Sequence, residues 1–195
     1  MMTGLAGLSS CSESDGEPDE YANWKDRNET FFATLEDSLA AHPGMWMKFK
    51  SAAKDQSLTT GKNTDCIYVK VIESGEDGAS PVSTDSVRVS YEGRLIPSAT
   101  YPEGYIFDTR AYNGYDHDRN ATAKFLASSL VDGFSTALYH MHRGDYWRVY
   151  IPYTLGYKEK SQSSIPAYST LIFDLTLIDF TPAGHAMPVW RSRRQ

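Results

Sequence analysis

The side chains that most often make and break bonds are few and scattered in this chain. Its 195 residues contain five histidines and two cysteines, Cys11 and Cys66. The sequence has no CxxC or HExxH spacing and no glycine-rich phosphate loop. A disulfide between the two cysteines is not expected, because it would close a long loop onto an acidic, extended tail. The sequence therefore predicts neither a metal nor a cofactor.

A different kind of chemistry is suggested by residues 130–157, where apolar and aromatic side chains surround one short helical pattern. The helical pattern begins near Leu130 and ends at Met141. A strand-like segment at 147–151 follows, and then a turn that ends at Tyr157. An apolar segment with few polar groups is typical of the wall of a ligand pocket. We therefore interpret this stretch as the centre of a candidate binding site.

Alternating apolar residues predict the strands that would position this stretch. In residues 66–73 the side chains of Ile67, Val69 and Val71 share one face, as they would in a strand. Residues 86–91 alternate in the same way. Further strands are expected at 106–108, 147–151 and 171–180, whereas 109–124 is polar and reads as a loop. Several strands around one helix predict an α+β domain with an antiparallel sheet.

A helix is expected ahead of this domain, over residues 19–41. Aromatic and aliphatic residues recur there at spacings of three, four and seven, and Pro43-Gly44 should end the helix. Its apolar face either packs on the main domain or forms a surface for a homodimer or a client. The apolar face is made of Trp24, Phe31, Phe32, Leu35 and Leu39. An apolar cluster at 45–49 follows, and the polar residues 50–63 are interpreted as a linker.

The first residues resemble part of an export signal. Leu8-Ser9-Ser10-Cys11 is similar to the lipobox of bacterial lipoproteins, in which the cysteine carries the lipid. A basic start and a full apolar core are missing or shortened, so residues 1–19 are interpreted as a truncated signal and an acidic tether. Lipidation of Cys11 would place the chain in the cell envelope, at the periplasm or outer membrane. The alternative is a flexible start with a free thiol.

Composition narrows the range of partners. The net charge of −6 argues against nucleic-acid binding, which requires a basic surface. The sequence contains no run of eighteen apolar residues, so it predicts no transmembrane helix. The C-terminal residues 182–195 end in three arginines and are expected to form a solvated tail.

Five segments, taken in order, resemble the FKBP-type peptidyl-prolyl isomerases over residues 64–181. The resemblance implies a five- or six-stranded antiparallel sheet curled around one short helix. With the lipobox, the chain is also similar to lipoprotein FKBPs of Bacteroidetes-type bacteria. The segments are Val87-Arg88-Val89-Ser90-Tyr91-Glu92-Gly93, Phe107-Asp108, Leu130-Val131-Asp132-Gly133-Phe134, the pair Ile151-Pro152 with Leu155-Gly156-Tyr157, and Ile165 to Asp174.

The resemblance also implies a site. Phe134 would form the pocket floor, Tyr157 would offer its hydroxyl to a substrate carbonyl, and the backbone N–H of Val131 would be a second donor. Asp108 would lie at the rim near Tyr91, although an aspartate there could instead cap the following loop. The expected catalytic residues are Tyr91, Asp108 and Tyr157, and the expected substrate-binding residues are Phe107, Leu130, Val131, Phe134, Ile165 and Phe173.

The sequence departs from the family pattern at two pocket positions. Phe134 stands where the family usually has tryptophan, and Lys158 stands where it usually has glycine. The loop 158–164 is polar, and Phe125 is the candidate for an aromatic wall that the family usually supplies from the 109–124 region. The implied function is isomerisation of X-Pro bonds in exported proteins, with macrolides as inhibitors. The alternative is a weakly catalytic client-binding or scaffold module of the cell envelope.

Overall fold

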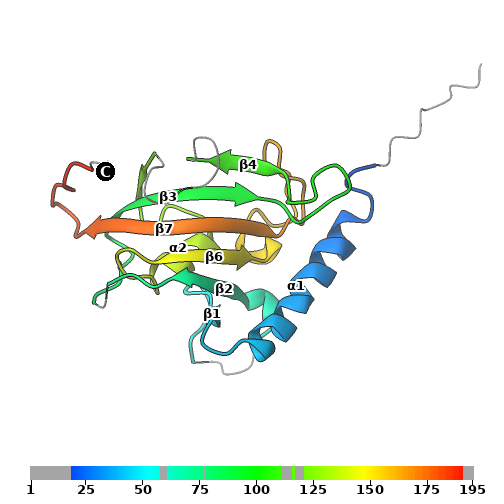
Figure 1. Cartoon of the computed structure of the whole chain (residues 1–195), viewed down its shortest axis with the longest axis horizontal. Helices are drawn as coiled ribbons and strands as arrows, with labels where there is room; N and C mark the ends of the chain where they lie inside the picture. Colours follow the sequence, from blue (N-terminus) through cyan, green and yellow to red (C-terminus); the bar gives the residue numbers. More distant parts are fainter. Residues whose placement is uncertain (1–18, 58–60, 77, 111–115, 117–120, 191–195) are drawn as a thin grey trace, which may run out of the picture.

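The computed structural model describes residues 19–57, 61–76, 78–110, 116 and 121–190. These residues form one antiparallel sheet with a short helix on one of its faces and a longer helix beside it (Figure 1). Among them, no helix has the length and apolar character needed to cross a membrane.

Seven strands form the sheet, in the order β1-β2-β6-β7-β3-β4, with β5 paired to β3. All the strand pairs are antiparallel, and β3 and β7 pair along nearly their whole length. The strands are β1 (Trp46–Lys50), β2 (Cys66–Glu73), β3 (Ser86–Arg94), β4 (Ile106–Thr109), β5 (Ala123–Leu126), β6 (Tyr146–Ile151) and β7 (Leu171–Thr181).

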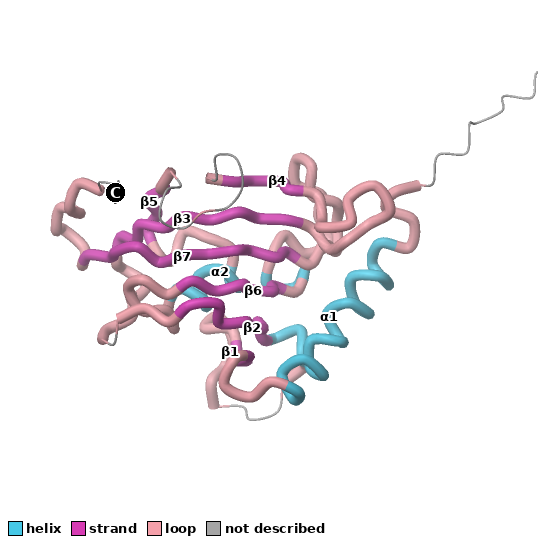
Figure 2. The backbone as a smooth tube through the Cα atoms, viewed as in Figure 1, coloured by secondary structure: helices cyan, strands magenta, loops and turns pink. Residues whose placement is uncertain are grey.

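The helices take different places around the sheet. The short helix α2 (Asp132–Leu138) lies behind the strands in Figure 2, and α1 (Trp24–Ala41) runs obliquely past one end of them. Single 3-10 turns, η1 (Asn63–Asp65) and η2 (Tyr153–Leu155), complete the regular structure of the described residues. The α+β class and the helix ahead of the sheet confirm the prediction from the sequence.

The main core lies between α2 and the sheet. Val69, Val149 and Leu175 come from three neighbouring strands and are fully buried against Leu138 of the helix. Gly133 allows the close approach, because a Cβ at this position would collide with Ile151 on β6. This contact fixes the start of α2, and therefore Phe134, relative to the sheet.

Two strands were not expected from the sequence, so the sheet has seven strands in place of five or six. The cluster at 45–49 forms β1, which pairs with β2 from Trp46↔Lys70 to Lys50↔Cys66. Lysines at alternate positions disguise β1, and they are common on the edge strands of sheets. The four residues of β5 follow a polar loop and are too short for a clear alternation.

The helices begin and end somewhat differently from the prediction. The expected helix over 19–41 begins only at Trp24, because Asn23 adopts a left-handed conformation. Asp19 instead accepts a hydrogen bond from the backbone N–H of Tyr21. The central helix, α2, ends at Leu138 and not at Met141. His140 lies just beyond this end, and its ring stacks on that of Phe49 with centroids 4.1 Å apart.

The apolar face of α1 lies against the domain. Trp24, Phe32 and Leu35 are buried, and the ring of Phe32 meets the edge of Tyr68 on β2. This arrangement fits the packing alternative for the helix, whereas a homodimer through α1 stays a prediction. At the other terminus, Arg88 donates a 2.6 Å hydrogen bond to the carbonyl of Pro188. Most residues of 182–190 are exposed, as expected of a solvated tail, and this bond ties one point of the tail to β3.

Candidate functional site

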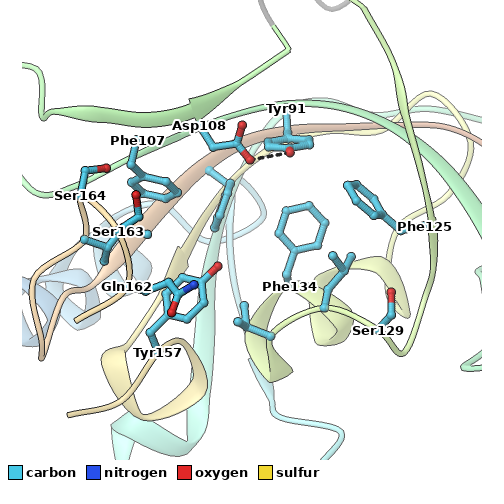
Figure 3. Close-up of a pocket in the computed structure, with 14 residues that line it drawn as sticks. Tyr91, Phe107, Asp108, Phe125, Ser129, Phe134, Tyr157, Gln162, Ser163 and Ser164 are labelled. Atoms are coloured by element: carbon cyan, nitrogen blue, oxygen red, sulfur yellow. Dashed lines mark hydrogen bonds between the residues drawn. The ribbon is translucent and has the colours of Figure 1, made fainter. Parts of the chain in front are cut away.

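All nine pocket residues expected from the sequence line one cavity of about 450 Å³ between α2, β3, β4 and the connection from β6 to β7 (Figure 3). Their roles in catalysis and binding stay predictions. The cavity is lined by Tyr91, Phe107, Asp108, Phe125, Ser129, Leu130, Val131, Phe134, Tyr157, Gln162, Ser163, Ser164, Ile165 and Phe173. Cys11, the expected lipidation site, lies outside the described residues.

Aromatic rings that meet edge to face form the interior of the pocket. The ring of Phe134 lies nearly perpendicular to those of Tyr91 and Phe173, at centroid distances of 6.0 and 5.0 Å. Phe107 packs on Phe173 in the same way at 5.5 Å. Each ring fixes the tilt of its neighbour, because edge-to-face pairs have a preferred geometry. The result is a rigid apolar box suited to a small ring such as the side chain of proline.

Gly93 makes room for two of these rings. A Cβ at this position would lie 2.6 Å from both Phe107 Cε2 and Phe173 Cε1, which is inside van der Waals contact. Phe107 comes from β4 and Phe173 from β7, the two strands that flank β3. The absence of a side chain at Gly93 therefore lets both rings pack over β3 and complete the pocket wall.

Tyr91 and Asp108 form a polar pair at one side of the pocket. The Tyr91 hydroxyl donates to Asp108 Oδ2 at 2.6 Å. Burial, together with this carboxylate, raises the pKa of Tyr91 to about 12. The phenol therefore stays protonated across the physiological range and keeps donating. The expected proximity of Asp108 to Tyr91 is present, whereas most of the loop that this aspartate could cap lies outside the described residues.

Two hydrogen-bond donors at the pocket have no acceptor within the described residues. The hydroxyl of Tyr157 makes no hydrogen bond there, and neither does the backbone N–H of Val131 just ahead of α2. The Tyr157 side chain is 38 % exposed. Burial of the remainder, and the charge of Asp108, raise the pKa of its phenol. Both groups can therefore donate to the carbonyls of a bound peptide.

The rim opposite Phe125 is polar (Figure 3). Gln162 and Ile165 exchange two backbone hydrogen bonds of 2.9 Å, which close a tight turn with Ser163 and Ser164 at its tip. Sequence reasoning described this loop as polar but did not place Gln162, Ser163, Ser164 or Ser129 at the site. No local motif marks these residues, because only the tertiary fold brings the loop over the pocket.

Lys158 occupies a position that suits glycine. Its φ is 62°, in the left-handed region, where residues with a Cβ are strained. Its N–H donates to the carbonyl of Tyr153, and its carbonyl accepts from Tyr168. The backbone therefore keeps the shape that glycine would take freely, directly after the pocket residue Tyr157.

A partly buried ionic cluster supports the sheet behind the pocket. Arg148 on β6 grips Asp174 on β7 with two hydrogen bonds of 2.6 and 2.9 Å. Arg94 on β3 joins Asp174 at 3.3 Å and also pairs with Glu92. Because side chains alternate along a strand, Asp174 faces away from the pocket while its neighbour Phe173 faces into it. No group of three or more metal-ligating side chains lies within the described ranges.

The fold and the pocket agree with a comparison to protein families. A model described as FKBP-type peptidyl-prolyl cis-trans isomerase matches residues 78–178. This match spans half of the chain and includes all the residues that line the pocket, together with β3, β4, β5, β6 and most of β7. The chain belongs to the FKBP-type peptidyl-prolyl cis-trans isomerase family, which confirms the family inferred from the sequence.

Curated relatives from Escherichia coli K12 cover a similar region. The chain is 37 % identical over 114 residues to the FKBP-type 22 kDa peptidyl-prolyl cis-trans isomerase, covering 58 % of this chain and 49 % of that protein. It is 32 % identical over 134 residues to FKBP-type peptidyl-prolyl cis-trans isomerase FkpA, which covers 69 % of this chain and 44 % of that protein. The chain thus spans about half the length of these relatives. Similarity to a lipoprotein subgroup stays a prediction.

A solved structure shows the same fold. The crystal structure of FkpA from Escherichia coli superimposes with a TM-score of 0.58 at 25 % sequence identity. The superposition covers 83 % of this chain and 63 % of that chain.

Proposed function

We propose that the protein is a peptidyl-prolyl cis-trans isomerase that assists the folding of exported proteins. The observation that carries the proposal is the aromatic box bordered by two donors, Tyr157 and Val131, that have no acceptor among the residues the structure describes. Family membership supports the same activity. The reaction needs no nucleophile or base, since no covalent bond is made or broken.

The chemistry is rotation about an amide. The X-Pro bond is a tertiary amide whose cis and trans forms differ by about 0.5–1 kcal/mol, separated by a barrier of about 20 kcal/mol. A planar amide is stabilised by charge-separated resonance, which the twisted transition state loses. An apolar pocket supports that charge separation less well than water does, so it favours the twisted form. A thousandfold acceleration requires about 4 kcal/mol.

Each part of the pocket has a proposed role in this rotation. Phe134, Phe107 and Phe173 would hold the proline ring. The Tyr157 hydroxyl and the Val131 N–H would hold the carbonyls on either side of the twisting bond, so that the peptide binds already partly twisted. The hydrogen bond from the Tyr91 phenol would keep Asp108 in place at the rim, where its carboxylate would face the substrate amide.

An assay of cis/trans exchange on short X-Pro peptides tests this proposal. The native chain should accelerate exchange above the spontaneous rate. Tyr157→Phe and Asp108→Ala should each lower kcat/KM about tenfold, which corresponds to about 1.4 kcal/mol of lost transition-state stabilisation. Glu159→Gln, on the same loop but outside the pocket lining, is a control that should keep the native rate.

A client-binding module with little turnover is the second candidate. It is favoured by the phenylalanine at the floor and by the polar rim of Gln162, Ser163 and Ser164, which leaves the mouth of the pocket less shielded from water. If the native chain shows no rate above background but still suppresses aggregation of an unfolded client, the binding module is correct and the isomerase proposal fails.

Inhibition by macrolides follows from the same pocket. A macrolide would place an apolar ring on the floor formed by Phe134, a smaller surface than the family's tryptophan. We expect measurable but weak binding by the native chain and tighter binding by Phe134→Trp. Titration calorimetry of both proteins with one macrolide measures the difference, and equal affinities would exclude Phe134 as the determinant.

We also propose that the chain is held in the cell envelope by a lipid on Cys11. The lipobox-like residues 8–11 and the acidic residues that follow support this proposal. Labelling of cells with radioactive palmitate should mark the full-length chain and not Cys11→Ser. Absence of label on the native chain would remove the anchor from the proposal and leave the pocket chemistry unaffected.

A further inference from the structure

The pocket wall that carries Tyr157 and Ile165 belongs to the long connection from β6 to β7, residues 152–170. The regular structure of this connection is the single turn η2. Lys158, Ser163 and Tyr168 have φ angles of 62°, 52° and 63°, in the region that disfavours residues with a Cβ. Local preferences therefore work against this shape, and contacts from elsewhere in the chain must maintain it.

Asn28 of α1 provides one such contact. The residue is fully buried, its Oδ1 accepts a 2.7 Å hydrogen bond from the backbone N–H of Thr170, and its Nδ2 donates to the carbonyl of Trp24 at 2.7 Å. Thr170 is the last residue of the connection and lies three positions before Phe173. With both ends of its amide bonded, Asn28 is a fixed bridge between the helix and the entrance to β7.

Trp24 provides a second contact, one helical turn earlier. Its Nε1 donates to the hydroxyl of Ser169 at 2.8 Å, and that hydroxyl donates in turn to the carbonyl of Pro166 at 2.7 Å. Pro166 directly follows the pocket residue Ile165. The tryptophan is buried, so this chain of hydrogen bonds is protected from water.

The same end of α1 also contacts the beginning of the connection. Tyr153 of η2 meets the edge of Tyr168 at a centroid distance of 5.3 Å, and its hydroxyl donates to Glu29 of α1 at 3.3 Å. Lys25 lies over the Tyr168 ring at 5.7 Å. Both ends of the connection are therefore tied to the first turns of the helix.

We infer that Asn28 and Trp24 are positioning residues for the pocket: through Thr170 and Ser169 they hold the connection so that Tyr157 and Ile165 keep their places on its wall. These two residues lie outside the segment that matches the family model, residues 78–178. The effect on catalysis rests on the proposed isomerase function, whereas the effect on the shape of the wall does not.

The second half of α1 supplies a matched control. Leu35 is buried beside Phe32 and Tyr68, in a cluster separate from the main core, and makes none of the contacts to the connection described above. Leu35→Ala should lower thermal stability without disturbing the pocket wall. Asn28→Leu keeps a similar volume but leaves the Thr170 N–H unpaired, and Trp24→Phe keeps an aromatic ring while removing the donor to Ser169.

Hydrogen exchange of backbone amides tests the inference directly. In Asn28→Leu and Trp24→Phe, amides within 153–170 should exchange about tenfold faster than in the native chain, while those of β2 and β6 stay protected. Each protein is measured at a temperature equally far below its own midpoint of thermal unfolding. Under this condition, amides within 153–170 of Leu35→Ala should exchange at the native rate. If amide exchange within 153–170 is accelerated equally in all three variants, α1 stabilises the domain as a whole. That result would overturn the inference. If Asn28→Leu does not fold, Trp24→Phe carries the test.

The isomerase assay adds a readout that a purely structural role would not change. At the same offset from each midpoint, Asn28→Leu and Trp24→Phe should lower kcat/KM about tenfold, or about 1.4 kcal/mol, and Leu35→Ala should stay within about twofold of the native value. If the native chain shows no isomerase activity, only the proposed function is refuted. Hydrogen exchange would still decide whether α1 positions the wall. If amides within 153–170 exchange faster while kcat/KM stays native, the shape of the wall does not affect catalysis. That result would overturn the role of Asn28 and Trp24 as positioning residues.

Discussion

The hydroxyl of Tyr91 on β3 points across to β4, where it donates a 2.6 Å hydrogen bond to Oδ2 of Asp108. This bond joins a ring that packs on Phe134 and Phe173 to a carboxylate at the mouth of the pocket. Through it, the deepest apolar contacts determine where the charged group at the entrance lies.

The first prediction concerns the titration of Tyr91. Its pKa is raised to about 12, so the unfolded chain, near 10, loses this proton first as the pH rises. The stabilising contribution of the protonated phenol is therefore complete below about pH 10 and is lost as the pH approaches 12. In Asp108→Ala the pKa of Tyr91 should fall but stay above 10, because burial, the larger cause, remains. The phenolate absorbance of each protein, minus that of its Tyr91→Phe counterpart, measures this pKa. An unchanged pKa would show that the carboxylate contributes nothing to the shift.

The second prediction concerns Gly93. In Gly93→Ala the new methyl group would displace Phe107 and Phe173, destabilising the fold by about 1–3 kcal/mol and distorting the pocket wall. Denaturant unfolding measures the first effect and peptide isomerisation the second. Gly61→Ala is the control, because a Cβ there meets nothing closer than 3.7 Å and should have little effect.

The third prediction concerns Lys158. Its left-handed backbone costs about 1–2 kcal/mol, and glycine removes this strain while adding about 0.5–1 kcal/mol of unfolded-state entropy. Lys158→Gly should therefore stabilise the fold by roughly 0.5–1 kcal/mol, the difference between those two ranges. Lys158→Ala keeps a Cβ and should give no gain. A gain in both variants, measured by thermal unfolding, would point to the lysine side chain in place of backbone strain.

The fourth prediction concerns acid stability. Partial burial lowers the pKa of His140, whose ring stacks on Phe49, so the folded state favours the neutral ring. The corresponding stability is present above the unfolded pKa of about 6.5 and is lost as the pH falls through the lower folded value. His140→Phe keeps the stacking and removes the titration. Its unfolding free energy should fall less than the native value between pH 7 and pH 5; identical profiles would exclude His140.

Much of the fold followed from alternation along single strands. Residues 66–73 and 86–91 bury one or both faces in the core, so their apolar pattern was legible. β1 was missed because Lys48 and Lys50 occupy one of its faces, where Lys48 pairs with Glu36 of α1. Glu36 lies twelve residues before Lys48, and the alternation of residues within one strand does not reveal such a pair.

The pocket followed mainly from the family resemblance, because no local pattern links Tyr91 to Asp108 or to Tyr157. Four lining residues were not revealed by the sequence, and three of them are polar residues on one loop: Gln162, Ser163 and Ser164. Their place depends on left-handed turns and on the contacts of α1, which no spacing rule describes. The bridge from Asn28 to Thr170 spans 142 positions and was likewise invisible.

The pairing of β1 with β2 bears on how far the protein can be shortened. A chain reduced to residues 78–178, the span of the family match, would lack β1, β2 and α1. β6 would then become a bare edge, and Val149 and Trp147 would lose their neighbours on β2, Val69 and Val71. An uncovered apolar edge invites pairing between molecules. We therefore expect the smallest soluble, monodisperse fragment to start near residue 19, and one that starts at residue 78 to aggregate.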